Sequence, residues 1–158
     1  MRGEIQAVVT SVEDGDTLTV RIDGATHRVR LSDIDAPEVA HCAGSEATCL
    51  RKGQRFGQES RDHLASMVMG RTVHLACWDQ DARYGRSVCR VFVGSLDVNR
   101  EQVKAGLAWF NKKYSKDKGM EIEQSAARRA RRGLWEDAYP VAPWLWRENC
   151  WKRGLCDQ

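Results

Sequence analysis

The stretch "TLTVRIDGATHRVRL", residues 17–31, decides the fold class of this 158-residue chain. Its apolar and polar residues alternate, which is typical of β-strands with one buried face, and the alternation breaks at Asp23-Gly24. An Asp-Gly pair between two alternating runs is a strong signal for a tight β-hairpin turn. Together with the preceding β-rich run "IQAVVTSV", the stretch predicts three antiparallel strands near residues 4–12, 16–22 and 26–34.

Two further strands and three helices are predicted downstream. "TVHLACW" (72–78) and "SVCRVFVG" (87–94) are strand candidates that flank a polar turn, "DQDARYGR". Five strands with helices between and after them predict a mainly β, α+β fold: a five-stranded OB-fold barrel with three helices packed outside. The helical patterns are "FGQESRDHLASMVMG" (56–70), "DVNREQVKAG" (97–106), capped by Asp97 or Asn99, and "MEIEQSAARRARRG" (120–133), with Ile122, Ala126 and Ala130 on one face.

The domain organisation is simple. A chain of this length is expected to form one domain and to bury a hydrophobic core without the help of disulfides or metal ions. We expect residues 1–138 to form that domain. Residues 139–158, "YPVAPWLWRENCWKRGLCDQ", form an irregular, tryptophan-rich C-terminal extension that is expected to pack on the same domain, its tryptophans covering apolar surface.

Composition limits the class of protein. Charged residues make up 30% and hydrophobic residues 42%, as in ordinary soluble globular proteins. No apolar run approaches the roughly 20 residues that span a bilayer, so we expect no membrane association, and we expect a monomer. The net charge of +3 fits a polyanionic partner. "MRGEIQAVVT" has no apolar leader, so we expect a protein that is either cytoplasmic, or secreted or periplasmic after removal of a leader.

Six cysteines leave two possibilities open. The close pairs Cys42/Cys49 and Cys150/Cys156 could form small-loop disulfides in an oxidising compartment, or all six could be buried or free thiols in a reducing one. The long segment 39–55 suggests an active-site flap, which a Cys42–Cys49 bridge would stiffen. A zinc site with His41 is not expected, because a fourth ligand and the usual spacing are lacking.

Acidic residues gather in two places that neighbouring strand ends can bring together. "VEDGDTLTV" (12–20) places Asp14 and Asp16 on a turn, and "SDIDAPE" (32–38) supplies Asp33, Asp35 and Glu38. Carboxylates from two adjacent strand ends can hold a hard divalent cation. Pro37 removes a ladder donor, so we expect the strand to end or bulge at Asp35-Ala36 and to aim a carboxylate and a carbonyl at one ion. The structural alternatives are an ordinary turn and a buried salt bridge.

"DGDTL" (14–18), "VRLSDIDAPE" (29–38) and "RYGR" (83–86), in this order, resemble the staphylococcal nuclease (thermonuclease) family. The resemblance runs from about residue 5 to 135 and includes "VNREQVKAGLAW" and "EQSAARRARRGLW". It implies an OB-fold nuclease that hydrolyses DNA and RNA with Ca²⁺, cutting the 5′-oxygen–phosphorus bond and leaving 3′-phosphate ends.

The resemblance also implies site residues. Asp16 and Asp35 would ligate Ca²⁺ through their carboxylates and Ala36 through its backbone carbonyl, and Glu38 would be the general base. Arg30 and Arg86 would bind the scissile phosphate, since guanidinium forks donate charge-assisted hydrogen bonds to phosphate oxygens. Three substrate-binding residues are implied further out, namely Arg83, Tyr84 and Tyr114. Lys112 stands where the family has a second tyrosine, so we expect an altered nucleotide pocket.

Two other functions are weighed against the nuclease. One is a catalytically weak nucleic-acid- or protein-binding module that kept the barrel and lost catalysis. Its expected signature is a partly missing acidic and arginine set, whereas Asp16, Arg30, Asp35, Glu38 and Arg86 are all present. The other is a partner-binding protein whose tryptophan-rich extension is the functional part.

Overall fold

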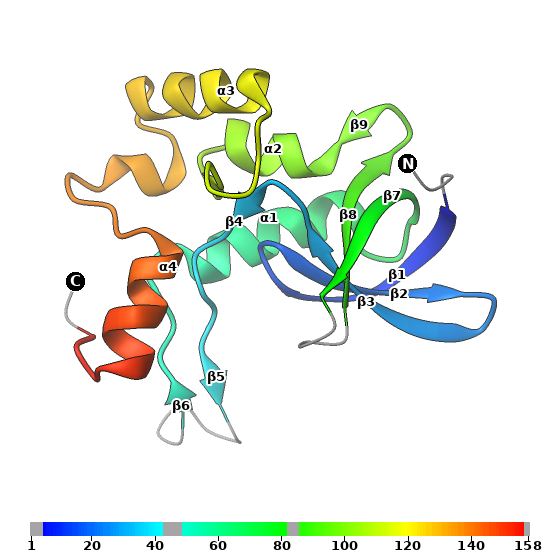
Figure 1. Cartoon of the computed structure of the whole chain (residues 1–158), viewed down its shortest axis with the longest axis horizontal. Helices are drawn as coiled ribbons and strands as arrows, with labels where there is room; N and C mark the ends of the chain where they lie inside the picture. The colour runs from blue at the N-terminus through cyan, green and yellow to red at the C-terminus, as the bar shows by residue number, and fades with distance from the viewer. Residues whose placement is uncertain (1–4, 43–48, 82–85, 157–158) are drawn as a thin grey trace.

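Five strands form a closed barrel in this computed structural model, which describes residues 5–42, 49–81 and 86–156, with residues 49–50, 79–81 and 86 described by their backbone alone. The strands follow the order β3-β2-β1-β7-β8, and a parallel pairing of β3 with β8 closes the ring (Figure 1). The other pairings are antiparallel, so the barrel is mixed. The predicted OB-like α+β barrel is confirmed. Its strands are β1 (Ile5–Asp14), β2 (Thr17–Ile22), β3 (Ala25–Leu31), β7 (Thr72–Asp81) and β8 (Arg86–Val93).

The predicted hairpin turn lies at Asp23-Gly24. Both residues have positive φ, 49° and 81°, as a type I′ turn requires. Ile22 pairs with Ala25 across the turn, which sets the register of β2 and β3 along their length. Four apolar residues of the two strands, Leu18, Val20, Val29 and Leu31, are buried in the hydrophobic core.

The third strand ends earlier than the sequence predicted. β3 stops at Leu31, and the chain turns through Ser32 and Asp33, where φ is 70°. Ile34 and Asp35 then form a separate short strand, β4 (Ile34–Asp35), which pairs with β10 (Trp109–Phe110). The predicted continuous strand over 26–34 is therefore wrong, whereas the predicted end at Asp35-Ala36 is confirmed, because β4 ends at Asp35. The left-handed conformation at Asp33 redirects the chain before the proline can.

The three predicted helices lie outside the barrel, namely α1 (Gly57–Val68), α2 (Val98–Lys104) and α3 (Lys118–Arg129), and the structure adds a fourth in the C-terminal extension. Asp97 caps α2 by accepting a hydrogen bond from the amide of Arg100 at 3.1 Å. The buried face of α3 carries Met120 and Ala127. Ile122 is 66% exposed, so the apolar face predicted from Ile122, Ala126 and Ala130 is wrong.

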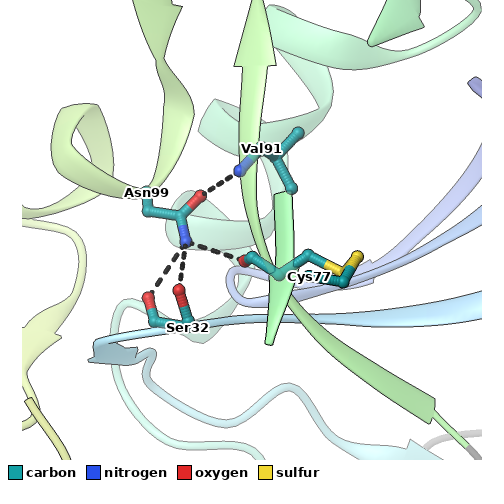
Figure 2. Close-up of a disulfide and its surroundings, with 5 residues drawn as sticks. Ser32, Cys77, Val91 and Asn99 are labelled. Atoms are coloured by element: carbon teal, nitrogen blue, oxygen red, sulfur yellow. Dashed lines mark hydrogen bonds between the residues drawn. A yellow bond between two sulfur atoms is a disulfide. The ribbon is translucent and has the colours of Figure 1, made fainter. Parts of the chain in front are cut away.

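Asn99 does not cap α2 but joins it to the barrel (Figure 2). Its side chain is fully buried; Oδ1 accepts from the amide of Val91 at 3.0 Å, and Nδ2 donates to the carbonyls of Ser32 and Cys89 at 3.0 and 3.1 Å. One amide therefore ties α2 to β8 and to the turn after β3. That turn leads directly into the acidic segment 33–38.

The C-terminal extension is helical rather than irregular. α4 (Pro143–Trp146) continues into a π-helical segment, Arg147–Lys152, and a 3-10 turn, Gly133–Glu136, precedes them. The prediction of an irregular tail is wrong because Pro143 supplies a helix start that the tryptophan-rich composition obscured. Both helical pieces lie beside the hairpin of β5 (His41–Cys42) and β6 (Cys49–Arg51) in Figure 1. One further strand, β9 (Leu96–Asp97), extends the sheet next to β8.

Where both cysteines are described, the structure contains one of the predicted disulfides and one that was not predicted. Cys150–Cys156 is bridged, in agreement with one of the two predicted close pairs. Cys77–Cys89 is a bridge that the sequence analysis missed; the two residues face each other in the register of β7 and β8. Cys42 is also disulfide-bonded, and its backbone pairs with that of Cys49, whose side chain lies outside the described residues. The described part of the chain has no free cysteine, so the alternative of free thiols is wrong there.

Within the described ranges, no helix combines the length and apolarity that a membrane crossing needs.

Candidate active site

Three buried carboxylates meet where β2 begins and β4 ends. Asp16, Asp35 and Glu38 are 6%, 2% and 8% exposed, and each is paired with an arginine. Burying a charge is costly unless it is paired and hydrogen-bonded, so the contacts of these groups explain how the fold tolerates them.

The turn that carries Asp16 is packed tightly against α1. A Cβ on Gly15 would lie 1.8 Å from Ser60 Oγ and 2.8 Å from the Cβ of Ala36, so only glycine fits. The Gly15 carbonyl also accepts a hydrogen bond of 2.8 Å from Gln102 Nε2 on α2. The two helices therefore fix the turn, and with it the place of Asp16.

Asp16 binds the second acidic segment directly. Its Oδ2 accepts a hydrogen bond of 2.7 Å from the amide of Ala36, and its Oδ1 accepts one of 3.1 Å from Thr17 Oγ1. The Ala36 peptide is thereby held against the Asp16 carboxylate. The sequence reasoning placed Asp16, Asp35 and the Ala36 carbonyl around one ion, and the structure brings the three residues together.

Arg30 lies between the two aspartates. Its Nη1 is 3.0 Å from Asp16 Oδ2, and its Nη2 is 3.5 Å from Asp35 Oδ1. The Arg30 side chain is 16% exposed, and its Nη1 also donates to the carbonyl of Leu31 at 3.0 Å. The structure thus contains the buried salt bridge of the alternative reading, but with two acids rather than one, at the place predicted for a phosphate-binding site.

Arg147, from the C-terminal extension, is a site residue that the sequence reasoning missed. Its Nη1 is 3.1 Å from Asp35 Oδ1 and 2.6 Å from Glu38 Oε1, and its Nη2 is 2.7 Å from Asp35 Oδ2. No spacing or motif in the sequence links residue 147 to residues 35 and 38, more than a hundred positions earlier. The tertiary packing of the extension alone places it here.

Gln54 is a second contributor that was not foreseen. The amide of Glu38 donates to Gln54 Oε1 at 3.2 Å, and the amide of Gln54 donates to the Glu38 carbonyl at 2.8 Å. Gln54 Nε2 also donates to the carbonyl of Val141 in the extension. This buried glutamine therefore fixes the backbone of Glu38 and connects it to the C-terminal segment.

The electrostatics of the cluster differ from one acid to the next. Burial, with a contribution from the charge of Asp16, raises the pKa of Glu38 to about 7. Burial also raises the pKa of Asp35, although hydrogen bonds from Arg147 and the charge of Arg30 act in the opposite direction. Burial would raise the pKa of Asp16, but the charge of Arg30 and several hydrogen bonds hold it below its usual value.

The cluster fits a cation by its chemistry. Asp14 stands beside Asp16, and burial together with the charge of Asp16 raises its pKa well above the ordinary value. Four carboxyl groups, Asp14, Asp16, Asp35 and Glu38, thus lie in or beside a cluster in which Arg30 and Arg147 supply the ion pairs. Among the described residues there is no group of three His, Cys, Asp or Glu side chains arranged to hold a metal ion. A cation would therefore rely on Asp16, Asp35, the Ala36 carbonyl and water, a ligand set that suits Ca²⁺.

The structure describes the remaining predicted site residues only in part. Arg86 begins β8, where its backbone pairs in parallel with Arg28, but its side chain lies outside the described residues. Arg83 and Tyr84 lie outside the described residues altogether. Tyr114 is 75% exposed on the loop after β10, the strand that pairs with Asp35, and its ring lies 5.3 Å from Lys113 Nζ. Their roles stay predictions.

Comparison with known proteins places this barrel and its acidic cluster in a family of nucleases. Residues 28–137 match the staphylococcal nuclease homologue family, and the chain belongs to that family. An uncharacterized endonuclease of Escherichia coli O157:H7 is 39% identical over 147 residues, covering 92% of this chain and 87% of its own. The micrococcal nuclease of Shigella flexneri is 34% identical over 157 residues, covering 92% and 80%. An uncharacterized endonuclease of Haemophilus influenzae is 38% identical over 142 residues, covering 89% and 72%.

Proposed function

We propose that this protein is a Ca²⁺-dependent, sugar-nonspecific nuclease that hydrolyses phosphodiester bonds of DNA and RNA, cutting the 5′-oxygen–phosphorus bond to leave 3′-phosphate ends. Family membership and the nuclease names of several relatives support the general activity. The observation that carries the proposal is the contact of Arg30 with both Asp16 and Asp35, with Glu38 joined to Asp35 through Arg147.

Asp16, Asp35 and the carbonyl of Ala36 would hold the calcium ion. When bound, Ca²⁺ supplies a Lewis acid at a phosphoryl oxygen and orients the attacking water. The tight turn at Gly15 and the Asp16–Ala36 hydrogen bond hold these oxygens in place before any ligand arrives. Such preorganisation lowers the cost of assembling the site around substrate.

Arg30 would bind the scissile phosphate. A guanidinium has five N–H donors, so the ion pairs to Asp16 and Asp35 and the hydrogen bond to the Leu31 carbonyl leave donors for a phosphate oxygen. Arg86 begins β8 beside Arg28, two positions before Arg30 on β3, so a second arginine could reach the phosphate from the neighbouring strand. Two guanidiniums would together offset the charge that builds up during hydrolysis.

Glu38 would take the proton of the attacking water. A general base works best when its pKa lies near the working pH, and burial brings the pKa of Glu38 to about 7. Further from the reacting phosphate, the exposed ring of Tyr114 offers a face on which a base could stack, with Lys113 beside it. Arg83 and Tyr84 would add contacts to the nucleotide.

The test is degradation of plasmid DNA and of single-stranded RNA with Ca²⁺ and with a chelator. We expect cleavage of both substrates with Ca²⁺ and almost no cleavage with the chelator. In Glu38→Gln we expect the cleavage rate to fall about 10²-fold or more. Glu136→Gln, which changes an exposed glutamate, is the matched control and keeps full activity. End-labelling of the products establishes whether the phosphate stays on the 3′ end. Cleavage that is indifferent to chelation would overturn the calcium assignment.

The same assay addresses the binding-module alternative. A catalytically weak module would retain salt-sensitive binding to nucleic acid without turnover at any Ca²⁺ concentration, because phosphate contacts alone release counterions. Turnover that depends on Glu38 excludes it.

A further inference from the structure

Arg147 is far from the acidic residues in the sequence and in direct contact with two of them in the fold. Its guanidinium grips both oxygens of Asp35 through Nη2 and Nη1, at 2.7 and 3.1 Å, and the same Nη1 reaches Glu38 Oε1 at 2.6 Å. Two parallel N–H···O bonds to one carboxylate form the bidentate geometry that arginine favours, and it adds directional specificity to the ion pair.

The segment that carries Arg147 is anchored on both sides of it. Trp146 is buried, and its Nε1 donates to the Lys52 carbonyl at 3.0 Å; Trp151 Nε1 donates to the same carbonyl at 2.9 Å. Cys150 is buried and bridged to Cys156. The backbone of Arg147 is therefore held in place by contacts of its own, and the guanidinium is presented to the acids from a fixed position.

Arg30 and Arg147 share the contacts to the three buried carboxylates. Asp16 pairs with Arg30 and accepts from the Ala36 amide, and Glu38 pairs with Arg147. Asp35 pairs with both guanidiniums. Asp35 and Glu38 repel each other when ionised, so a single Nη1 between them fixes their separation. Arg147 holds Glu38 through Oε1 and so fixes the orientation of the carboxylate.

We propose that Arg147 is a positioning residue of the site, which holds the Glu38 carboxylate against Asp35 in the orientation needed to take a proton from the attacking water. The inference rests on the proposed nuclease function and adds the C-terminal extension to its machinery. Arg147 acts through Glu38 and does not itself bind the nucleic acid.

The kinetic test compares Arg147→Gln and Arg147→Lys with Arg153→Gln, which removes the same charge from an exposed position in the same segment. In Arg147→Gln we expect kcat to fall on the order of 10²-fold with KM nearly unchanged, because a misplaced base costs rate rather than binding. Arg147→Lys keeps the charge without the fork and should recover only part of the rate. Arg153→Gln should behave as the wild type.

Two outcomes of this experiment would overturn the proposal. A rise in KM at constant kcat would mean that Arg147 binds substrate. A gain in activity would mean that Arg147 blocks the site. Calcium affinity, measured by calorimetry without nucleic acid, is expected to stay equal or become tighter in Arg147→Gln, because a positive charge leaves the site. Clearly weaker calcium binding would instead assign Arg147 to building the cation site, and it too would overturn the proposal.

A readout independent of turnover separates this proposal from the proposed function. In protein labelled with ¹³C at the glutamate carboxyl and kept free of metal, the Glu38 resonance is expected to shift in Arg147→Gln and to stay unchanged in Arg153→Gln. If the wild type cleaves no nucleic acid, the nuclease proposal fails, while this spectrum still shows whether Arg147 holds Glu38. An unshifted Glu38 resonance in Arg147→Gln would remove the basis of the inference.

Discussion

The amide of Ala36 donates a hydrogen bond of 2.7 Å to Oδ2 of Asp16, across twenty positions of sequence. This bond joins the turn before β2 to the segment after β4, and it places the peptide of Ala36 against a buried carboxylate. Asp16 Oδ2 also forms an ion pair with Arg30 Nη1 at 3.0 Å, so backbone and guanidinium converge on one oxygen. The acidic site depends on how closely these two segments approach.

Gly15→Ala tests that approach. The added Cβ overlaps Ser60 Oγ, which is buried and bonded to the Leu107 carbonyl at 2.6 Å and so has little room to move. We expect a loss of about 2 kcal/mol in the free energy of unfolding, as overpacking commonly costs, and weaker calcium binding by calorimetry. Gly119→Ala in α3, where the nearest atom to the added Cβ is Arg100 Nη1 at 3.3 Å, is the control. Unchanged stability and calcium affinity in Gly15→Ala would contradict this account of the turn.

The pKa of Glu38 predicts a pH-dependent stability in metal-free protein. Burial raises the folded-state pKa from 4.5 to about 7, so the folded state binds more protons than the unfolded state between these values. Stability therefore falls as pH rises through this window, by up to about 3 kcal/mol. Urea unfolding in chelator at about pH 5 and about pH 8 should show this loss in the wild type, and it should be absent from Glu38→Gln. Parallel behaviour of the two proteins would show that Glu38 titrates as it does in the unfolded chain.

Asn99→Leu tests the link between α2 and the barrel. The substitution keeps the size of the side chain but leaves the Val91 amide and the Ser32 carbonyl without their partner. We expect a loss of about 3 kcal/mol in the free energy of unfolding, since buried polar groups left unpaired are costly. Asn149→Leu, at a half-buried position in the extension, is the matched control, and denaturant unfolding is the measurement. A loss no larger than that of the control would mean that Asn99 is not a structural link.

Replacing Cys77 and Cys89 together by alanine should destabilise the barrel. The bridge closes a loop with a sequence separation of 12, which corresponds to about 3 kcal/mol of unfolded-state entropy. Thermal unfolding of the double variant, beside wild type treated with a reductant, measures the effect. A double variant as stable as the oxidised wild type would show that the cross-strand bridge contributes nothing.

Most of the barrel could be predicted because its signals are local. Alternation in residues 17–31 and the Asp23-Gly24 turn specify a hairpin within one short window, and the later strands and helices follow from similar patterns. The incorrect predictions concern features for which the neighbouring residues in the sequence carry no signal. The left-handed Asp33 ended β3 early, and the exposed Ile122 showed that a helix's buried face depends on what packs against it.

The sequence alone was sufficient to indicate the family, the barrel and the approach of Asp16 to Arg30, because Thr17 pairs with Arg30 in a hairpin whose register the local turn at Asp23-Gly24 sets. It also indicated Asp35 and Glu38 as site residues through the family resemblance, although the strand that carries Asp35 pairs with the distant β10. It could not indicate Arg147, Gln54 or the Cys77–Cys89 bridge as partners. Those contacts join elements by packing, and packing is decided only when the extension docks on the hairpin near Lys52 and β7 meets β8 in register.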